Sequence, residues 1–91
     1  MQKVNIESDK IVEIVLQLTT DKLENRIDYL RNYILNMIKT AKEAAIEFRE
    51  RYKEYIKAYT KILLIYLIEL YKRTGDPKVL KKIVDMLGVF L

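Results

Sequence analysis

The chain has 91 residues, of which 51% are hydrophobic and 33% charged, and its formal net charge is +4. It contains no Cys and no His, which excludes disulfides, thiolate metal sites and the usual general base near neutral pH. We therefore expect a single helical domain over residues 1–91 with no cofactor, no metal site and no enzymatic activity.

The sequence shows no membrane signature. Its first residues, MQKVNIESDK, lack the basic-then-apolar layout of a signal peptide. The longest apolar run, Ile62 to Ile68, has seven residues, whereas a spanning helix needs about 20. We expect no membrane span and a cytoplasmic location. Many Lys and Glu with only two Gln fit a heat-adapted source, although AT-rich coding DNA gives the same bias.

The first expected element is a short helix over residues 9–19. Four apolar residues there fall at helical spacing, and Ser8 or Asp9 can serve as the N-cap; they are Ile11, Ile14, Val15 and Leu18. The same stretch also alternates apolar and polar residues, which permits a hairpin of residues 3–7 with residues 11–18. We favour the helix because no later segment offers another strand, and an isolated hairpin is only marginally stable.

The second expected element is one long amphipathic helix over residues 21–73. Asp21 is its expected N-cap, with Glu24 completing a capping box. No Gly or Pro occurs in this range. The apolar residues of its first half step alternately by four and three, which is a heptad seam; they are Leu23, Ile27, Leu30, Ile34, Met37, Ala41, Ala44 and Phe48.

The seam continues after Phe48 with a phase slip. Its second half has the same spacing and consists of Tyr52, Tyr55, Tyr59, Ile62 and Tyr66. The extra step of four at the junction is a stutter, which locally unwinds a supercoil. A continuous helix over residues 21–73 would be about 80 Å long, too long for a compact domain of this size. Either the helix kinks or breaks near residues 48–52, or it stays long and pairs with another copy. The uninterrupted seam favours the second alternative.

The third expected element is a C-terminal helix over residues 77–87. Gly75 is expected to end the preceding helix, Asp76 to cap the next one, and Pro77 to occupy its first position. The segment VLKKIVDMLGV, residues 79–89, resembles the first helix and turn of a helix-turn-helix unit, which implies a turn at Gly88 and DNA binding. The alternative is an amphipathic helix that ends at a glycine cap.

Two charged sets are candidates for binding. Glu43, Glu47, Glu50 and Glu54 would share one face of the long helix, and we interpret this face as solvated rather than as a cation site, which would usually include His. The basic set is Arg49, Lys53, Lys57, Lys61, Lys72, Arg73, Lys78, Lys81 and Lys82. Residues 1–50 have eight basic and nine acidic residues, whereas residues 51–91 have nine and four. This asymmetry would favour a polyanion at the C-terminal half, unless the bases only form salt bridges on a solvated face.

The sequence therefore predicts an all-α protein of three helices, arranged as a helical hairpin or bundle or as a coiled-coil-like dimer. Its expected function is non-catalytic: homo-oligomeric assembly, with a dimer favoured, or binding of a protein partner. The expected interface consists of Leu23, Ile27, Leu30, Ile34, Met37, Phe48, Tyr52, Tyr55, Tyr59, Ile62 and Tyr66. The alternative function is nucleic-acid binding through the basic C-terminal half.

Overall fold

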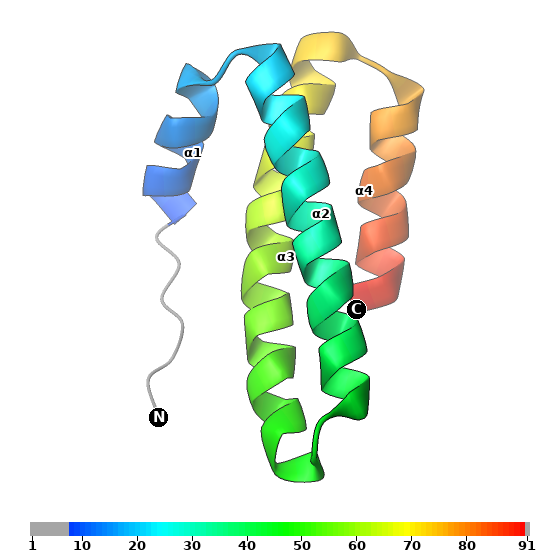
Figure 1. Cartoon of the computed structure of the whole chain (residues 1–91). Coiled ribbons are helices and arrows are strands. Elements are labelled where there is room, and N and C mark those ends of the chain that lie inside the picture. Colours follow the sequence, from blue (N-terminus) through cyan, green and yellow to red (C-terminus); the bar gives the residue numbers. More distant parts are fainter. Residues whose placement is uncertain (1–7, 91) are drawn as a thin grey trace.

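A computed structural model of the chain describes residues 8–90, and these residues form four helices (Figure 1). The helices are α1 (Ser8–Gln17), α2 (Thr20–Glu43), α3 (Ile46–Thr74) and α4 (Pro77–Phe90). The all-α fold class is confirmed, and residues 8–90 contain no strand. The predicted number of three helices is wrong, because the expected helix over residues 21–73 consists of two helices.

The N-terminal segment is helical, as the favoured alternative predicted. α1 ends at Gln17, so residues 11–17 do not pair as a hairpin strand; residues 3–7, the other arm of that alternative, lie outside the described residues. α2 begins one residue earlier than predicted, and its N-cap is Thr19 rather than Asp21. The Thr19 hydroxyl oxygen accepts a hydrogen bond from the Lys22 backbone N–H at 3.3 Å. The predicted capping box is therefore wrong, because the third residue after the N-cap Thr19 is Lys22, which cannot accept the reciprocal hydrogen bond.

The expected long helix breaks at Ala44 and Ala45. Both residues have extended backbones, with ψ angles of 156° and 151°. Alanine has the highest intrinsic helix propensity, so local preference does not cause the break. The break lets the apolar seam of α2 fold back onto that of α3, and this burial outweighs the lost helical hydrogen bonds. The predicted kink near residues 48–52 is absent, because α3 continues through that range.

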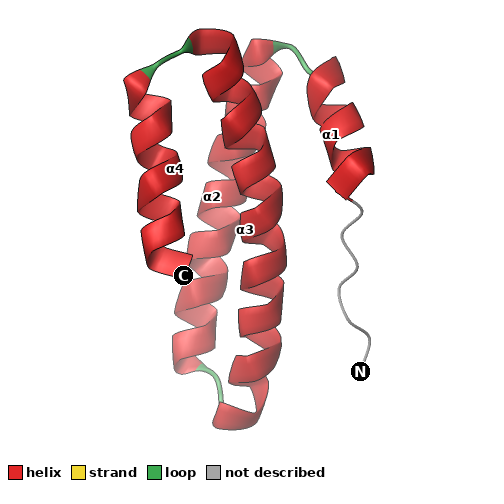
Figure 2. Ribbon diagram, turned by 180° about the vertical axis from the view of Figure 1, so that it is seen from behind, coloured by secondary structure: helices red, strands yellow, loops and turns green. Residues whose placement is uncertain are grey.

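The loop after α2 is held by polar contacts in place of the missing helical ones. The Ala45 carbonyl accepts a hydrogen bond from the Phe48 N–H at 2.9 Å. The Arg49 side chain donates from Nε to the Ala44 carbonyl at 3.2 Å. α2 and α3 then run antiparallel and side by side (Figures 1 and 2). The longest dimension of the molecule is consequently 41 Å, about half the length of the single helix expected.

α3 is the helix on which the other three pack. It contacts α1, α2 and α4, whereas no other pair of helices among the described residues makes a comparably extensive contact. Its buried side chains point to several sides of the helix and include Ile56, Leu63, Tyr66, Leu67 and Leu70. A helix that is apolar on most of its circumference must be covered from several directions. The short helices α1 and α4 lie on opposite sides of the α2–α3 hairpin and provide that cover (Figure 1).

The turn between α3 and α4 has the capping residues that the sequence predicted. Gly75 is left-handed, with φ of 62°, and its N–H donates to the Tyr71 carbonyl at 2.8 Å. The Asp76 carboxylate accepts a hydrogen bond from the Lys78 N–H at 2.9 Å, which makes it the cap of α4. The predicted end of α4 at residue 87 is wrong. α4 continues through Gly88 to Phe90, so the turn that the helix-turn-helix resemblance implied is not formed at Gly88.

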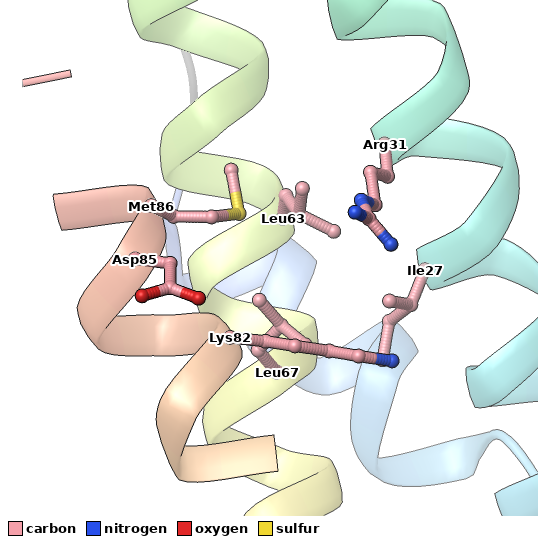
Figure 3. A pocket seen from close by; sticks show the side chains of 7 residues that line it. All are labelled: Ile27, Arg31, Leu63, Leu67, Lys82, Asp85 and Met86. Carbon is pink, nitrogen blue, oxygen red and sulfur yellow. The ribbon is translucent and has the colours of Figure 1, made fainter. Parts of the chain in front are cut away.

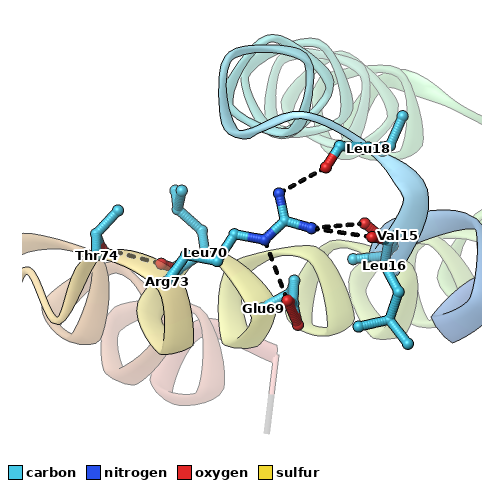
Figure 4. A network of polar contacts seen from close by, with 7 residues as sticks. All are labelled: Val15, Leu16, Leu18, Glu69, Leu70, Arg73 and Thr74. Atoms are coloured by element: carbon cyan, nitrogen blue, oxygen red, sulfur yellow. Dashed lines mark hydrogen bonds and ion pairs between the residues drawn. The ribbon is translucent and has the colours of Figure 1, made fainter.

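Arg73, in the last turn of α3, attaches α1 to the bundle (Figure 4). Its guanidinium donates to the backbone carbonyls of Leu18 at 2.6 Å, Val15 at 3.2 Å and Leu16 at 3.4 Å. Glu69 accepts from its Nε at 3.1 Å, which fixes the guanidinium plane. The last carbonyls of a helix have no partner inside that helix, and α1 has no basic residue in its own last turn. Arg73 therefore supplies the C-terminal cap of α1 from a distant part of the chain.

Replacement of Arg73 by Met should release α1 from the bundle while it keeps an apolar side chain on α3. Hydrogen bonds to charged groups contribute about 1.5–3 kcal/mol, and we expect a loss of about 2 kcal/mol in the free energy of unfolding. Amide hydrogen exchange should speed up in α1 before it does in α2 and α3. The matched control is Lys72→Met on an exposed neighbouring position. Equal effects of the two substitutions would contradict the capping role of Arg73.

Candidate interaction surfaces

The predicted interface residues lie mostly within the hairpin. Leu23, Ile27, Ile34 and Tyr66 are buried. Leu30, Met37, Tyr52, Tyr59 and Ile62 are half-buried and pack against the core. Only Phe48 and Tyr55 of this set are exposed. The two halves of the seam cover one another because the chain turns back at residues 44–45, so their periodicity reflects contacts inside one molecule.

A cluster of four tyrosines forms an exposed surface where α2 meets α3; we call Tyr29, Tyr33, Tyr55 and Tyr59 the tyrosine cluster. The Tyr29 and Tyr33 rings stack with centroids 6.4 Å apart, and the Tyr33 and Tyr59 rings meet edge to face at 5.1 Å. Tyr29 is 69% exposed, Tyr55 45% and Tyr33 41%. Three of these four side chains are therefore exposed, whereas Tyr59 is half-buried against the core.

Only two of these four tyrosines belong to the heptad seam that the sequence predicts. Tyr55 and Tyr59 belong to the predicted seam, whereas Tyr29 and Tyr33 lie beside the α2 seam and were not singled out. Their spacing of four residues places both rings on one face of α2, and this was the available signal. The spacing does not reveal which residues of α3 lie opposite, because that depends on the position of the turn at residues 44–45.

Tyr59 occupies the most enclosed position of the cluster. Burial of its phenol raises its pKa above the ordinary value of 10.0, and the neighbouring hydroxyls of Tyr33, Tyr55 and Tyr29 add to this shift. The neutral form of Tyr59 is thus favoured in the folded protein. At neutral pH the cluster is an uncharged surface with hydroxyl groups that can donate and accept hydrogen bonds.

Cations border the tyrosine cluster on α2. Arg26 precedes Tyr33 by seven residues and Lys22 precedes Tyr29 by seven, so each cation lies on the same face as its tyrosine. Both are exposed, and neither forms an ion pair within residues 8–90. The positions three and four residues from Arg26 carry no carboxylate. The surface therefore combines aromatic rings with unpaired positive charge.

A second surface feature is a groove between α2 and α4 above α3; we call it the α2–α4 groove (Figure 3). It contains a cavity of about 80 Å³. Its apolar lining consists of Ile27, Leu63, Leu67 and Met86, and its charged lining of Arg31, Lys82 and Asp85. The Lys82 side chain extends from α4 toward α2, where the Arg31 guanidinium points into the same space. Two cations thus converge over an apolar floor.

The basic residues proposed for nucleic acid do not all share one surface. Arg73 is committed to Glu69 and α1, Lys53 pairs with Glu50 at 3.4 Å, and Arg49 binds the hairpin loop. Arg49 and Lys53 lie at the loop end of α3, about 35 Å along the helix from the turn that leads to α4 (Figure 1). The other members are exposed: Lys57, Lys61, Lys72, Lys78, Lys81 and Lys82. Only the last four remain near that turn and on α4.

The acidic set is not one helical face. Glu43 is the last residue of α2, whereas Glu47, Glu50 and Glu54 belong to α3. All four are exposed. The break at residues 44–45 therefore separates the group whose spacing assumed a continuous helix.

Stability should fall at alkaline pH partly because of Tyr59. The pKa of Tyr59 is raised in the folded protein, so the unfolded chain loses the phenol proton at a lower pH than the folded chain does. The contribution of Tyr59 to the free energy of unfolding is therefore complete below pH 10 and is lost as the pH rises further. Tyr59→Phe keeps the ring but has no phenol proton to lose. The midpoint of urea unfolding should therefore decrease less between pH 9 and pH 11 in this variant than in the wild-type protein. Tyr71→Phe, outside the cluster, is the control. A Tyr59→Phe profile that parallels the wild-type profile would contradict this assignment.

No match to a known protein indicates a function for this chain, so the surface features are the basis for the proposal below. A comparison with protein-family models, curated protein sequences and solved structures finds no match. Residues 8–90 contain no group of three or more acidic, His or Cys side chains placed to hold a metal ion. No helix in the described part combines the length and apolarity needed to cross a bilayer. Within residues 8–90, the tyrosine cluster, the α2–α4 groove and the exposed lysines near the α3–α4 turn are the surface features on which we base a function.

Proposed function

We propose that this chain is a non-catalytic helical protein that acts through protein–protein contacts, in homo-oligomeric assembly or with a partner protein, and that the tyrosine cluster is its contact surface. The observation that carries this proposal is the exposure of Tyr29, Tyr33 and Tyr55 beside one another. The exposed faces of these rings make no contact that the ring pairs within the hairpin require. Their retention as an ordered, stacked group is typical of a surface that another molecule covers.

Tyrosine is well suited to such a contact. Each ring buries about 150–250 Å² when fully covered, at a low cost in side-chain entropy, and its hydroxyl stays hydrogen-bonded at the rim. Tyr and Arg are also the residue types that most often dominate the binding energy of an interface. Arg26, on the Tyr33 face of α2, adds this second type. The cluster thus has the composition of an interface centre.

Self-association is the form of this function that purified protein can test directly. The exposed rings of Tyr29 and Tyr55 can be removed with little effect on folding, so Tyr29→Ala/Tyr55→Ala should weaken self-association at least tenfold in sedimentation equilibrium between about 5 and 500 µM. The control is Leu35→Ala/Ile68→Ala, which removes two other exposed apolar side chains, one from α2 and one from α3. Unchanged association in the tyrosine variant, or an equal loss in the control, would refute this role for the cluster.

A second candidate function is nucleic-acid binding through the C-terminal half. The supporting observation is that Lys72, Lys78, Lys81 and Lys82 are exposed near the α3–α4 turn and on α4 and form no ion pair within residues 8–90. Such cations favour binding to a phosphate backbone, because they replace and release the counterions condensed on it. Their net effect is a basic end of the bundle.

The nucleic-acid alternative predicts binding that depends steeply on salt. Fluorescence anisotropy with labelled single-stranded and duplex nucleic acid should show micromolar affinity at about 50 mM salt and a loss of tens-fold at about 200 mM. Lys78→Ala/Lys81→Ala/Lys82→Ala should weaken it further. Lys22→Ala/Lys39→Ala/Lys42→Ala removes the same charge from α2 and should have a smaller effect. No binding at the lower salt would rule out this alternative.

A further inference from the structure

The α2–α4 groove combines an apolar floor with two cationic side chains. Arg31 from α2 and Lys82 from α4 line the same cavity, and neither forms an ion pair among the described residues. Asp85 offsets one of these charges but stays on the α4 side in Figure 3, so the groove keeps a net positive charge. Two like charges over an apolar floor repel one another, and an anion placed between them removes that repulsion.

The size of the cavity identifies the kind of occupant. Small-molecule pockets usually measure about 300–1,000 Å³, whereas this cavity measures about 80 Å³. It therefore fits an apolar side chain rather than a whole ligand. Its apolar floor of Ile27, Leu63, Leu67 and Met86 would contact that side chain, and carboxylates next to it would reach Arg31 and Lys82. The occupant is consequently an acidic amphipathic segment of a protein.

α1 carries such a segment on its outer side. Val12 is 42% exposed and Leu16 59%, and the two are four residues apart. At 100° per residue, Asp9 and Glu13 fall with them inside an arc of about 100°. Both carboxylates are exposed. The inner side of the same helix packs on the core through Val15, and Lys10 lies about 160° around the helix from Val12. The outer face of α1 is thus apolar and acidic.

We propose that α1 of a second copy of this chain docks in the α2–α4 groove, with Val12 and Leu16 over its apolar floor and with Asp9 and Glu13 facing Arg31 and Lys82. This inference rests on the proposed function, because it names a partner and a contact for homo-oligomeric assembly. The added helix would lie beside α2, α3 and α4 and would close the cavity between them.

The placement of the two surfaces makes this contact head-to-tail. α1 and α4 lie on opposite sides of the hairpin, so the groove of one molecule faces away from its own α1 (Figures 1 and 2). A contact between different surfaces of two copies leaves one free α1 and one free groove on the pair. Association therefore continues into rings or open chains rather than stopping at a two-fold dimer.

Charge exchange tests this contact separately from the tyrosine cluster. All proteins carry Tyr29→Ala/Tyr55→Ala, so that association through the tyrosine cluster is removed. The groove variant adds Arg31→Glu/Lys82→Glu, and the α1 variant adds Asp9→Lys/Glu13→Lys. Sedimentation velocity and light scattering measure the mass at about 10 and 200 µM. Far-UV circular dichroism verifies that each protein keeps its helix content.

The expected results follow from the head-to-tail geometry. The Tyr29→Ala/Tyr55→Ala protein should form a concentration-dependent series of oligomers, and each charge variant alone should weaken this association at least tenfold. A mixture of the two variants should regain association as alternating 1:1 hetero-oligomers, because the native α1 of one variant complements the native groove of the other, and the exchanged α1 complements the exchanged groove. A protein with all four charge substitutions should regain self-association.

Control substitutions separate the contact from a general effect of net charge. Lys57→Glu/Lys61→Glu changes the charge as much as the groove variant does, at exposed positions of α3, and should leave the oligomers intact. Glu47→Lys/Glu54→Lys is the corresponding control for α1. A monomeric Tyr29→Ala/Tyr55→Ala protein at 200 µM overturns the inference but leaves the proposed role of the tyrosine cluster standing. So does a mixture of the variants that stays monomeric.

Discussion

The structure depends on one constraint: residues 62–68 make α3 apolar around its whole circumference there, and the rest of a short chain must cover them. Leu63 and Leu67 are almost completely buried, and each of the other three helices packs on α3. The largest share of this cover comes from α2, which reaches α3 only because the helix breaks at Ala44 and Ala45. This two-residue break therefore allows the apolar residues of α2 and α3 to pack against one another and form the core. α1 and α4 are too short to cover the remaining surface completely.

Incomplete cover explains where the surface features lie. α4 is 14 residues long and α1 is 10, against 29 residues for α3, so the loop end of the hairpin has no third layer. α2 and α4 pack separately on α3, and a small cavity lined by the buried side chains of Ile27, Leu63 and Leu67 remains in the groove between them. The tyrosine cluster lies at another edge of the α2–α3 contact. Both features are consequences of an open bundle, in which the core reaches the surface along its edges.

Arg73 connects the core to the proposed self-association. A solvent-exposed cation would contribute to a polyanion site. The Arg73 guanidinium instead donates its hydrogen bonds to Glu69 and to backbone carbonyls at the end of α1. This holds α1 with Val15 inward and therefore with Val12, Leu16 and two carboxylates outward. The orientation of the acidic face of α1 and the stability of its docking thus depend on the same side chain. The positive charge of the C-terminal half is correspondingly smaller at the surface than the residue count implies.

Local patterns in the sequence determined the all-α class, the α3–α4 turn and the identity of most core residues, because capping chemistry and helical periodicity act over a few neighbouring residues. The same patterns did not reveal the break at Ala44 and Ala45, since alanine favours the helix and no Gly or Pro marks the turn. They also could not decide whether the seam of Leu23 to Tyr66 pairs within one chain or between two, because both arrangements bury the same residues. Only the tertiary structure decided this, by folding α2 onto α3. That fold then brought Tyr33 to Tyr59, Arg73 to the end of α1, and Arg31 and Lys82 to one cavity. These residues are 26 to 58 positions apart, and no local signal encodes their proximity.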